Sequence, residues 1–365
     1  MNDLVKRVVE LAIQIQQIPA PTFHEHTRAE FVRDRFASEG LQDICIDETG
    51  NVCARWIGQG AGKPLVVSAH LDTVFPLETS LRVARGSDLI HGPGLGDNSL
   101  GVAALLGLFW AFRERGLQPR EDVWLVANVC EEGLGDLRGM KAVVDRFSEN
   151  VRAYLVLEGL ALGHVYYRAV GVKRYRVTAR TSGGHSWSDY GQPSAVHELA
   201  KLVVELASLS LPIHPRTTMN VGRISGGTSV NVIASEASLD LDLRSEGQES
   251  LAALVSAVER LIQKANRAGV SIESRVIGQR PAGEISVSHP LVMLAQDCLR
   301  GQGLEAGLIS GSTDANVPLS KGYPAIVLGI TTGGSAHTVH EYINTAPIAQ
   351  GLEQLVRFVG RVWNA

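Results

Sequence analysis

Hydrophobic and polar positions change their period along this chain, and the change predicts two kinds of structure. In the N-terminal part, near-continuous apolar runs at residues 64–72, 122–130 and 153–159 are typical of strands buried on both faces of a sheet. Helical spacing of apolar residues separates these runs, and Thr22 and Glu25 have the spacing of a capping box that opens one such helix. This alternation predicts an α/β layer with a mostly parallel sheet, and the same texture returns near the C-terminus.

From about Gly171 the apolar residues alternate with polar ones, as in strands that face solvent on one side. The expected order of elements there is βαββαβ, which is a compact ferredoxin-like open sandwich. We therefore expect residues 171–281 to form an inserted lid domain, and residues 1–170 with 282–365 to form a discontinuous catalytic domain. The expected lid strands are 173–181, 217–227, 236–245 and 271–277, and the expected lid helices are about 195–206 and 249–268.

Composition and charge disfavour some classes of partner. The net charge is −4, with 45% hydrophobic and 20% charged residues, which is ordinary for a globular protein and does not favour nucleic acid. We see no apolar run near the roughly 18 residues that span a bilayer, so no membrane partner is expected. The four cysteines are scattered without a CxxC pair, and the charged N-terminus does not resemble a signal peptide. These features predict a cytoplasmic location with buried thiols.

Acidic and histidine side chains collect where the expected strands end. In an open α/β sheet, ligands bind beyond the carboxyl ends of the strands, so these side chains are expected to meet at one edge. Two histidines with several carboxylates suit a pair of Zn²⁺ ions better than Mg²⁺ or Ca²⁺, which prefer oxygen ligands alone. The residues at these positions are His70, Asp72, Asp97, Glu131, Glu132, Glu158 and His337.

Two metal ions about 3.5–4 Å apart need a bridging carboxylate, and Asp97 lies on a glycine-rich turn that suits this role. Asp72, two residues after His70, would accept the second ring proton of that histidine. Of the adjacent glutamates Glu131 and Glu132, one would be a ligand and the other a general base for water. The expected ligands besides the bridge are His70 and Glu158 on one ion, and Glu132 and His337 on the other.

Five motifs occur in the order SAHLDTV, GPGLGDNSLG, EEGLGDLRG, LEG and SAHTVHEY. Over essentially the whole chain, this order resembles the co-catalytic zinc exopeptidases and deacylases of metallopeptidase family 20, which include peptidase T, aminoacylase and acetylornithine deacetylase. The peptidase T branch is the most similar. The resemblance implies two Zn²⁺ ions per chain and a cis peptide bond between Asp97 and Asn98. It implies His70, Asp97 and Glu158 on one zinc, Asp97, Glu132 and His337 on the other, Glu131 as general base, and Asp72 behind His70.

The resemblance also implies a role for the lid. His185, in the glycine-rich segment SGGHSW, would polarise the scissile carbonyl, and its family counterpart reaches the metal site of the neighbouring subunit. A homodimer through the lid domain is therefore expected, and an open sheet has an edge strand suited to two-fold pairing. Asn231 and Arg244 are implied as substrate-binding groups, and a guanidinium fork suits a free carboxylate. The segment GSTDAN, which begins with Gly311 and Ser312, looks like a helix N-terminus suited to an anion.

These observations predict a metal-dependent hydrolase that cleaves one amide bond of a small peptide, with Glu131 moving a proton from water to the leaving amine. Co²⁺ or Mn²⁺ is expected to substitute for Zn²⁺. A deacylase of N-acyl amino acids with the same machinery is the alternative, and a non-catalytic peptide-binding relative is a third reading. Asp97 replaces the last glycine of a GxGxxG loop, which disfavours dinucleotide binding. His337 replaces the last glycine of GxSxG, which disfavours a serine hydrolase.

Overall fold

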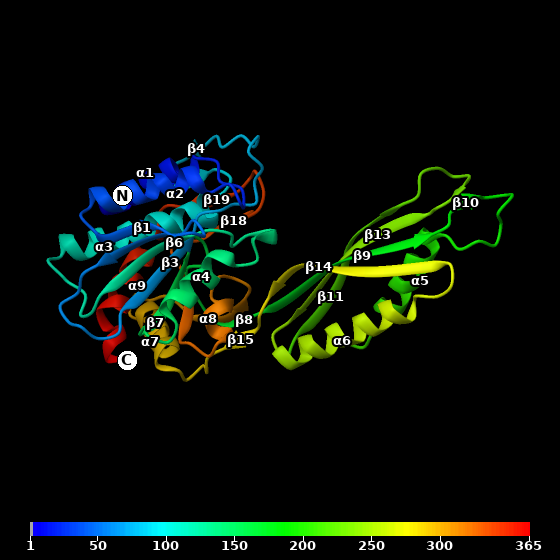
Figure 1. Cartoon of the computed structure of the whole chain (residues 1–365). Coiled ribbons are helices and arrows are strands. Elements are labelled where there is room, and N and C mark those ends of the chain that lie inside the picture. The colour runs from blue at the N-terminus through cyan, green and yellow to red at the C-terminus, as the bar shows by residue number, and fades with distance from the viewer. Residues whose placement is uncertain (1–2) are drawn as a thin grey trace. The chain divides into compact units, whose positions relative to one another are not determined.

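The computed structural model describes residues 3–365, and these divide into two compact units. One unit is formed by the chain up to Ala169 together with Glu284–Ala365, and the other by Val170–Gly283. Each unit has a hydrophobic core made only of its own residues, as expected of domains that pack around separate cores. Figure 1 shows the elements of both units, coloured by position in the chain.

The larger unit is built on a nine-stranded sheet. Its four neighbouring strands β6, β3, β7 and β17 run parallel, which confirms the predicted α/β class with a mostly parallel sheet. Nearly all their residues are buried, which is why their sequences read as continuous apolar runs. The path is β1 (Gln42–Ile46), β2 (Val52–Trp56), β6 (Val123–Asn128), β3 (Leu65–His70), β7 (Ala153–Glu158), β17 (Ala325–Gly329), β8 (His164–Ala169) and β15 (Gly283–Glu284), with β16 (Gly307–Gly311) paired to β8.

Helix α3 (Leu100–Glu114) packs against β3 and β7 and contacts both α1 (Asp3–Gln16) and α9 (Ile348–Arg361). By length and composition the stretch Leu95–Glu114 could cross a membrane, contrary to our expectation, but 89% of its most apolar 18 residues are buried inside the protein, so it is a core helix. The other α-helices of this unit are α2 (His26–Ser38), α4 (Arg138–Phe147), α7 (Pro290–Arg300) and α8 (Asn316–Ser320). A small sheet has the order β18 (Gly333–Gly334), β19 (Tyr342–Asn344), β5 (Leu89–His91) and β4 (Ala84–Arg85).

The smaller unit has the expected βαββαβ order, which confirms the ferredoxin-like sandwich. Helices α5 (Ala195–Ala207) and α6 (Gln248–Lys264) pack against its antiparallel sheet. Helix α6 ends earlier than expected because the Asn266 side chain donates to Ile262 O and Ile272 O and turns the chain into the next strand. The sheet order is β11 (Thr217–Gly226), β13 (Glu236–Ser245), β9 (Gly171–Thr181) and β14 (Val270–Arg280), and β10 (Gly184–His185) pairs separately with β12 (Val232–Ile233).

Candidate metal centre

Parallel strands deliver the first side chains of the site. His70 is the last residue of β3 and lies opposite Asn128, the last residue of β6. Glu158 is the last residue of the neighbouring strand β7. Glu131 and Glu132 follow β6 after a short turn in which Cys130 has a φ of 60°. Because the strands are parallel, all of these side chains reach the same edge of the sheet.

The five expected ligands form two groups of three that share Asp97. In the first group, His70 Nε2 lies 3.1 Å from Asp97 Oδ1 and 3.7 Å from Glu158 Oε2. In the second group, His337 Nε2 lies 3.0 Å from Asp97 Oδ2 and 3.1 Å from Glu132 Oε1. Each oxygen of Asp97 therefore faces a different histidine, which suits a carboxylate that bridges two cations.

The charges of these side chains fit a pair of cations. Burial raises the pKa of Glu158, since its charge is poorly solvated. Hydrogen bonds with Asp97 and Glu132 raise the pKa of His337 to about 10. Burial opposes the ionisation of Asp97, but hydrogen bonds from His337 and His70 hold its pKa below the usual range. Without metal, protons on the two histidines balance the negative charge of the carboxylates. Metal ions compete with these protons for the same nitrogen and oxygen atoms, so this set of side chains fits two metal ions.

Two buried side chains, for which the sequence pattern predicts no role, fix the loop that carries Asp97. The Asp97–Asn98 peptide bond is cis, as predicted. The Asn98 side chain donates to Leu157 O and accepts the Gly159 N–H, at 2.8 Å each, so it bonds to the backbone on both sides of Glu158. Glu341 accepts the Asp97 N–H at 2.9 Å, and burial raises the pKa of Glu341 to about 7. The loop of the shared aspartate is thus attached to two other segments of the site.

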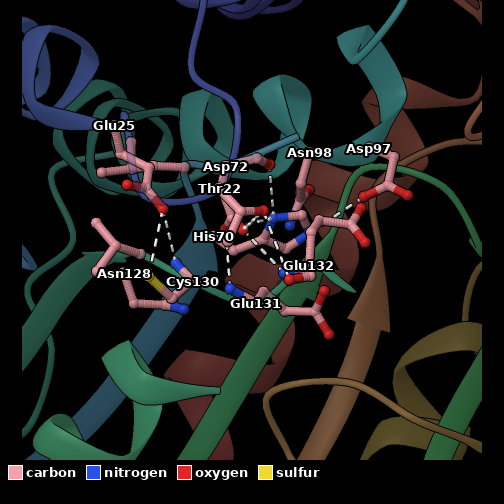
Figure 2. A network of polar contacts seen from close by, with 12 residues as sticks. Thr22, Glu25, His70, Asp72, Asp97, Asn98, Asn128, Cys130, Glu131 and Glu132 are labelled. Carbon is pink, nitrogen blue, oxygen red and sulfur yellow. Dashed lines mark hydrogen bonds and ion pairs between the residues drawn. The ribbon is translucent and has the colours of Figure 1, made fainter. Parts of the chain in front are cut away.

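Asp72 organises the adjacent pair of glutamates. Glu131 N–H donates to Asp72 Oδ1 at 2.9 Å, and Glu132 N–H donates to Asp72 Oδ2 at 2.8 Å, as Figure 2 shows. His70 Nδ1 lies 3.0 Å from the carbonyl oxygen of Asp72 and 3.6 Å from its carboxylate. The nearer partner of the His70 ring is therefore the main chain of Asp72, while the carboxylate sets the direction of the two acids. Those acids and His70 form a third group of close donors.

The expected capping box at Thr22 and Glu25 is wrong. Helix α2 begins at His26, and its N-cap Glu25 makes no side-chain cap hydrogen bond within the described chain. Instead, Thr22 Oγ1 donates to Asp72 Oδ2 at 2.9 Å, and Glu25 Oε1 accepts the Cys130 N–H at 3.1 Å (Figure 2). Both side chains bond to the segments that carry the predicted ligands, so tertiary partners have replaced the local ones.

A further buried pair beside the β3–β6 edge also escaped the sequence analysis. Asn128 Nδ2 donates to Asp314 Oδ2 at 2.7 Å. The other side-chain oxygens, Asn128 Oδ1 and Asp314 Oδ1, have no hydrogen-bond partner among residues 3–365. Burial raises the pKa of Asp314 to about 7. Because burial disfavours the charged form of the Asp314 carboxyl, this acid is suited to remain neutral.

Comparison with known proteins places the chain in a family. A sequence model described as peptidase family M20/M25/M40 matches residues 66–361, which is most of the chain. The chain belongs to this peptidase family. It is 23% identical over 357 residues to succinyl-diaminopimelate desuccinylase of Corynebacterium glutamicum, and the match covers 95% of this chain and 94% of that protein. With its family membership and its cluster of close donors, this M20-family chain is a metal-dependent hydrolase.

Solved structures share the fold of this M20-family chain. A tripeptidase from Staphylococcus aureus superposes with a TM-score of 0.85 at 21% identity over 99% of each chain. The Bacillus subtilis YXEP protein, described as a dinuclear metal binding peptidase from the M20 family, superposes with a TM-score of 0.71 at 15% identity over 99% of each chain. At these identities the likeness shows the fold, and it includes the inserted smaller unit.

Two of the expected lid residues lie together in the smaller unit. The strand that ends at His185 pairs with the strand that follows Asn231, and Ser186 N–H donates to Asn231 O at 3.0 Å. His185 Nδ1 accepts the N–H groups of Trp187 at 3.2 Å and Ser188 at 3.4 Å. A neutral His185 ring therefore carries its proton on Nε2, on an exposed side chain that can donate to an oxygen.

Arg244 does not join that pair. It lies near the C-terminal end of β13, whereas Asn231 precedes the N-terminal end of the same strand. The Arg244 Nε donates to Asp242 Oδ2 at 2.7 Å, so part of its guanidinium is already engaged by an acid. The register of β13 against β9 places Arg244 beside Val172, at the start of the unit.

The segment at Gly311 and Ser312 differs from the helix N-terminus that we expected. Gly311 is the last residue of β16, and the helix that follows, α8, has five residues and begins at Asn316. Thr313 N–H donates to Asn316 Oδ1 at 2.8 Å, and Ala315 N–H donates to Thr313 Oγ1 at 3.2 Å. These two N–H groups are satisfied within the segment and are not available to an anion.

Proposed function

We propose that this M20-family chain hydrolyses an amide bond of small peptides with two zinc ions. His70, Asp97 and Glu158 would hold one ion, and Asp97, Glu132 and His337 the other. The observation that carries the proposal is the position of Asp97, whose two oxygens face the two histidines at 3.1 and 3.0 Å. Two metals bound there would act as Lewis acids toward the carbonyl and would acidify water.

Glu131 is the proposed general base. Asp72 holds the backbone of both glutamates, so Glu132 can face His337 while Glu131 remains outside the two groups that share Asp97. Glu131 would take a proton from the attacking water as the oxygen adds to the carbonyl carbon. It would return that proton to the nitrogen as the C–N bond breaks, so the products are a carboxylic acid and an amine, which then become a carboxylate and an ammonium group by transfer of the acid's proton.

The side chains around the ligands support a peptide substrate. Four apolar side chains within two residues of Thr22, Asp72, Glu132 and His337 are more than a third exposed, although large apolar groups usually avoid water. Exposed apolar side chains so close in sequence to site residues would suit the uncharged side chains of a peptide. They are Phe23 (48%), Val74 (38%), Leu134 (56%) and Val339 (58%).

A deacylase of N-acyl amino acids is the second candidate. It is supported by the desuccinylase from Corynebacterium glutamicum, which the chain matches over nearly its whole length. The two candidates share the machinery and differ in the group on the carbonyl side of the scissile bond. A panel of di- and tripeptides beside N-succinyl and N-acetyl amino acids separates them by kcat/KM. We expect peptides to be the better substrates, and the reverse ranking would sink the peptide proposal.

The smaller unit is proposed as a lid that also forms a homodimer. The outer strands of its sheet are β11 and β14, and an edge strand favours two-fold pairing. His185 Nε2–H would donate to the scissile carbonyl oxygen at the partner's metal centre, with Asn231 beside it. Arg244, Gly311 and Ser312 remain proposed substrate contacts, and the cytoplasm remains the proposed compartment.

Metal analysis tests the core of the proposal. Purified protein should bind two zinc ions per chain, lose activity when they are removed by a chelator, and regain it with Zn²⁺, Co²⁺ or Mn²⁺. Full activity in protein from which all transition metal has been removed would refute the two-zinc proposal. Binding of two metals without turnover of any panel substrate would instead favour the non-catalytic reading.

A further inference from the structure

We propose that Glu341 is a positioning residue of the metal centre, which holds the Asp97 loop in its ligand-bearing shape and joins it to the turn that carries His337. The proposal rests on the proposed function, in which Asp97 and His337 are ligands. It assigns a role to the glutamate of the motif SAHTVHEY, which the ligand set does not use.

Both carboxylate oxygens of Glu341 are occupied by backbone donors. The Oε1 accepts N–H groups of Gly96 at 2.6 Å and Asp97 at 2.9 Å, and the Oε2 accepts the N–H of Gly94 at 3.0 Å. The Glu341 residue is 0% exposed. A carboxylate with this many N–H donors is fixed in direction, so Glu341 is a support for the loop and not a third acid on the metals.

The loop depends on this acceptor because its own backbone cannot supply one. Gly94 has a φ of 72°, which is the left-handed conformation that favours glycine, and the turn directs three N–H groups to the same side. Buried N–H groups left without an acceptor would each cost about 1–3 kcal/mol. The main chain of Glu341 adds a fourth contact, since its carbonyl oxygen accepts the Gly92 N–H at 2.9 Å.

Glu341 also belongs to the turn of His337. Thr338 N–H donates to Ser335 O at 3.2 Å, and Glu341 N–H donates to Thr338 O at 3.1 Å, so a short hydrogen-bonded turn links His337 to Glu341. A shift of the Asp97 loop would therefore also displace the turn that carries His337. The Asn98 side chain makes the corresponding link between the Asp97 loop and Glu158. Glu341 thus serves the group formed by Asp97, Glu132 and His337.

The variant Glu341→Gln tests the proposal, because its amide nitrogen would face at least one backbone N–H donor in place of an acceptor. Glu341→Asp keeps the charge but is too short to reach all three N–H groups. Glu198→Gln is the matched control, since Glu198 is a buried acid (4% exposed) in the other unit, where it bonds to Lys201 and Arg267. The readouts are Co²⁺ titration followed by visible absorption, metal stoichiometry after dialysis, and urea unfolding of the chelator-treated protein.

We expect wild-type protein to bind two Co²⁺ ions, and Glu341→Gln to bind one of them at least about tenfold more weakly, the usual effect of losing a support behind a ligand. The absorption spectrum of that ion should change, because Asp97 and His337 would meet it in altered positions. Glu341→Asp should lie between the two. Glu198→Gln should lower stability and leave both the affinity and the spectrum unchanged.

Two Co²⁺ ions with wild-type affinity and spectrum in Glu341→Gln would overturn the inference, even if that variant were less stable. A wild-type protein that binds fewer than two ions would instead overturn the proposed function on which the inference rests. If neither variant folds, amide hydrogen exchange of chelator-treated wild-type protein decides. The amides of Gly94, Gly96 and Asp97 should be protected, and exchange as fast as in an unfolded peptide would overturn the inference.

Discussion

Replacement of Asp72 by asparagine tests how the two adjacent glutamates are held apart. The buried carboxylate accepts from the Glu131 N–H, the Glu132 N–H and the Thr22 hydroxyl at 2.8–2.9 Å. Asparagine keeps the shape of the side chain, but an amide nitrogen replaces one of its two oxygens. If that oxygen stays with Glu132 and Thr22, which share Asp72 Oδ2, the new amide nitrogen faces the Glu131 N–H, donor against donor.

The magnitude follows from those bonds. A hydrogen bond to an ionised acceptor contributes about 1.5–3 kcal/mol, and a buried donor without a partner costs about 1–3 kcal/mol. We therefore expect the free energy of unfolding of the chelator-treated protein to fall by about 3 kcal/mol in Asp72→Asn. The matched variant Thr22→Val removes one neutral donor to the same oxygen and should cost only about 1 kcal/mol. Urea unfolding measures both values.

The same change should separate catalysis from metal binding. His70 Nδ1 keeps its nearer partner, the Asp72 carbonyl oxygen at 3.0 Å, so the ring of His70 stays oriented and the metals stay bound. The displaced residue is Glu131, so kcat should fall by about 10–100-fold. An Asp72→Asn protein with wild-type stability and kcat would refute this reasoning. Loss of metal with normal kcat per bound metal pair would instead show that Asp72 acts mainly by orienting His70.

Three further tests concern other parts of the structure. Glu131→Gln should abolish turnover and keep both metals, whereas Glu132→Gln should lose one metal. Elemental analysis and a turnover assay measure both effects, and the reverse result would make Glu131 the ligand and Glu132 the base. Asp314→Asn replaces an acid whose pKa is raised by burial to about 7. In wild-type protein the contribution of this acid to stability is therefore complete near pH 4 and is lost as the pH rises through 7. The unfolding free energy of chelator-treated Asp314→Asn should therefore gain on wild type between pH 5 and pH 8 by at most about 3 kcal/mol, and parallel pH curves would contradict this. Glu131→Gln and His185→Ala should each be nearly inactive alone, yet active when co-expressed, because one site of a mixed dimer has an intact Glu131 and the partner's intact His185. Mixed dimers no more active than the parents would show that His185 serves its own subunit.

The positions of the proposed ligands could be predicted because each depends on a local pattern. A buried parallel strand is a continuous apolar run, so the end of the run marks the edge where His70 and Glu158 lie. The glycine-rich turn marked Asp97 in the same way. The end of each apolar run therefore predicts which side chains reach a common edge of the sheet. In the structure those side chains lie close together.

The supports of the ligands could not be predicted, because each joins segments far apart in the chain. Glu341 bonds to Gly94 across 247 positions, and Thr22 bonds to Asp72 across 50. At Thr22 and Glu25 the local pattern even favoured the wrong partner, since the residue types that cap a helix are also good tertiary donors and acceptors. The hydrogen bond between Asn128 and Asp314 likewise depends on burial that no local pattern reveals.

The claim that Asp97 bridges two metal ions is tested most directly by anomalous diffraction from crystals of the zinc-loaded protein, measured at the zinc absorption edge. We expect two anomalous peaks about 3.5–4 Å apart, with one oxygen of Asp97 on each ion. His70 and Glu158 should complete one ion, and Glu132 and His337 the other. A single peak, or two peaks of which Asp97 contacts only one, would contradict the account.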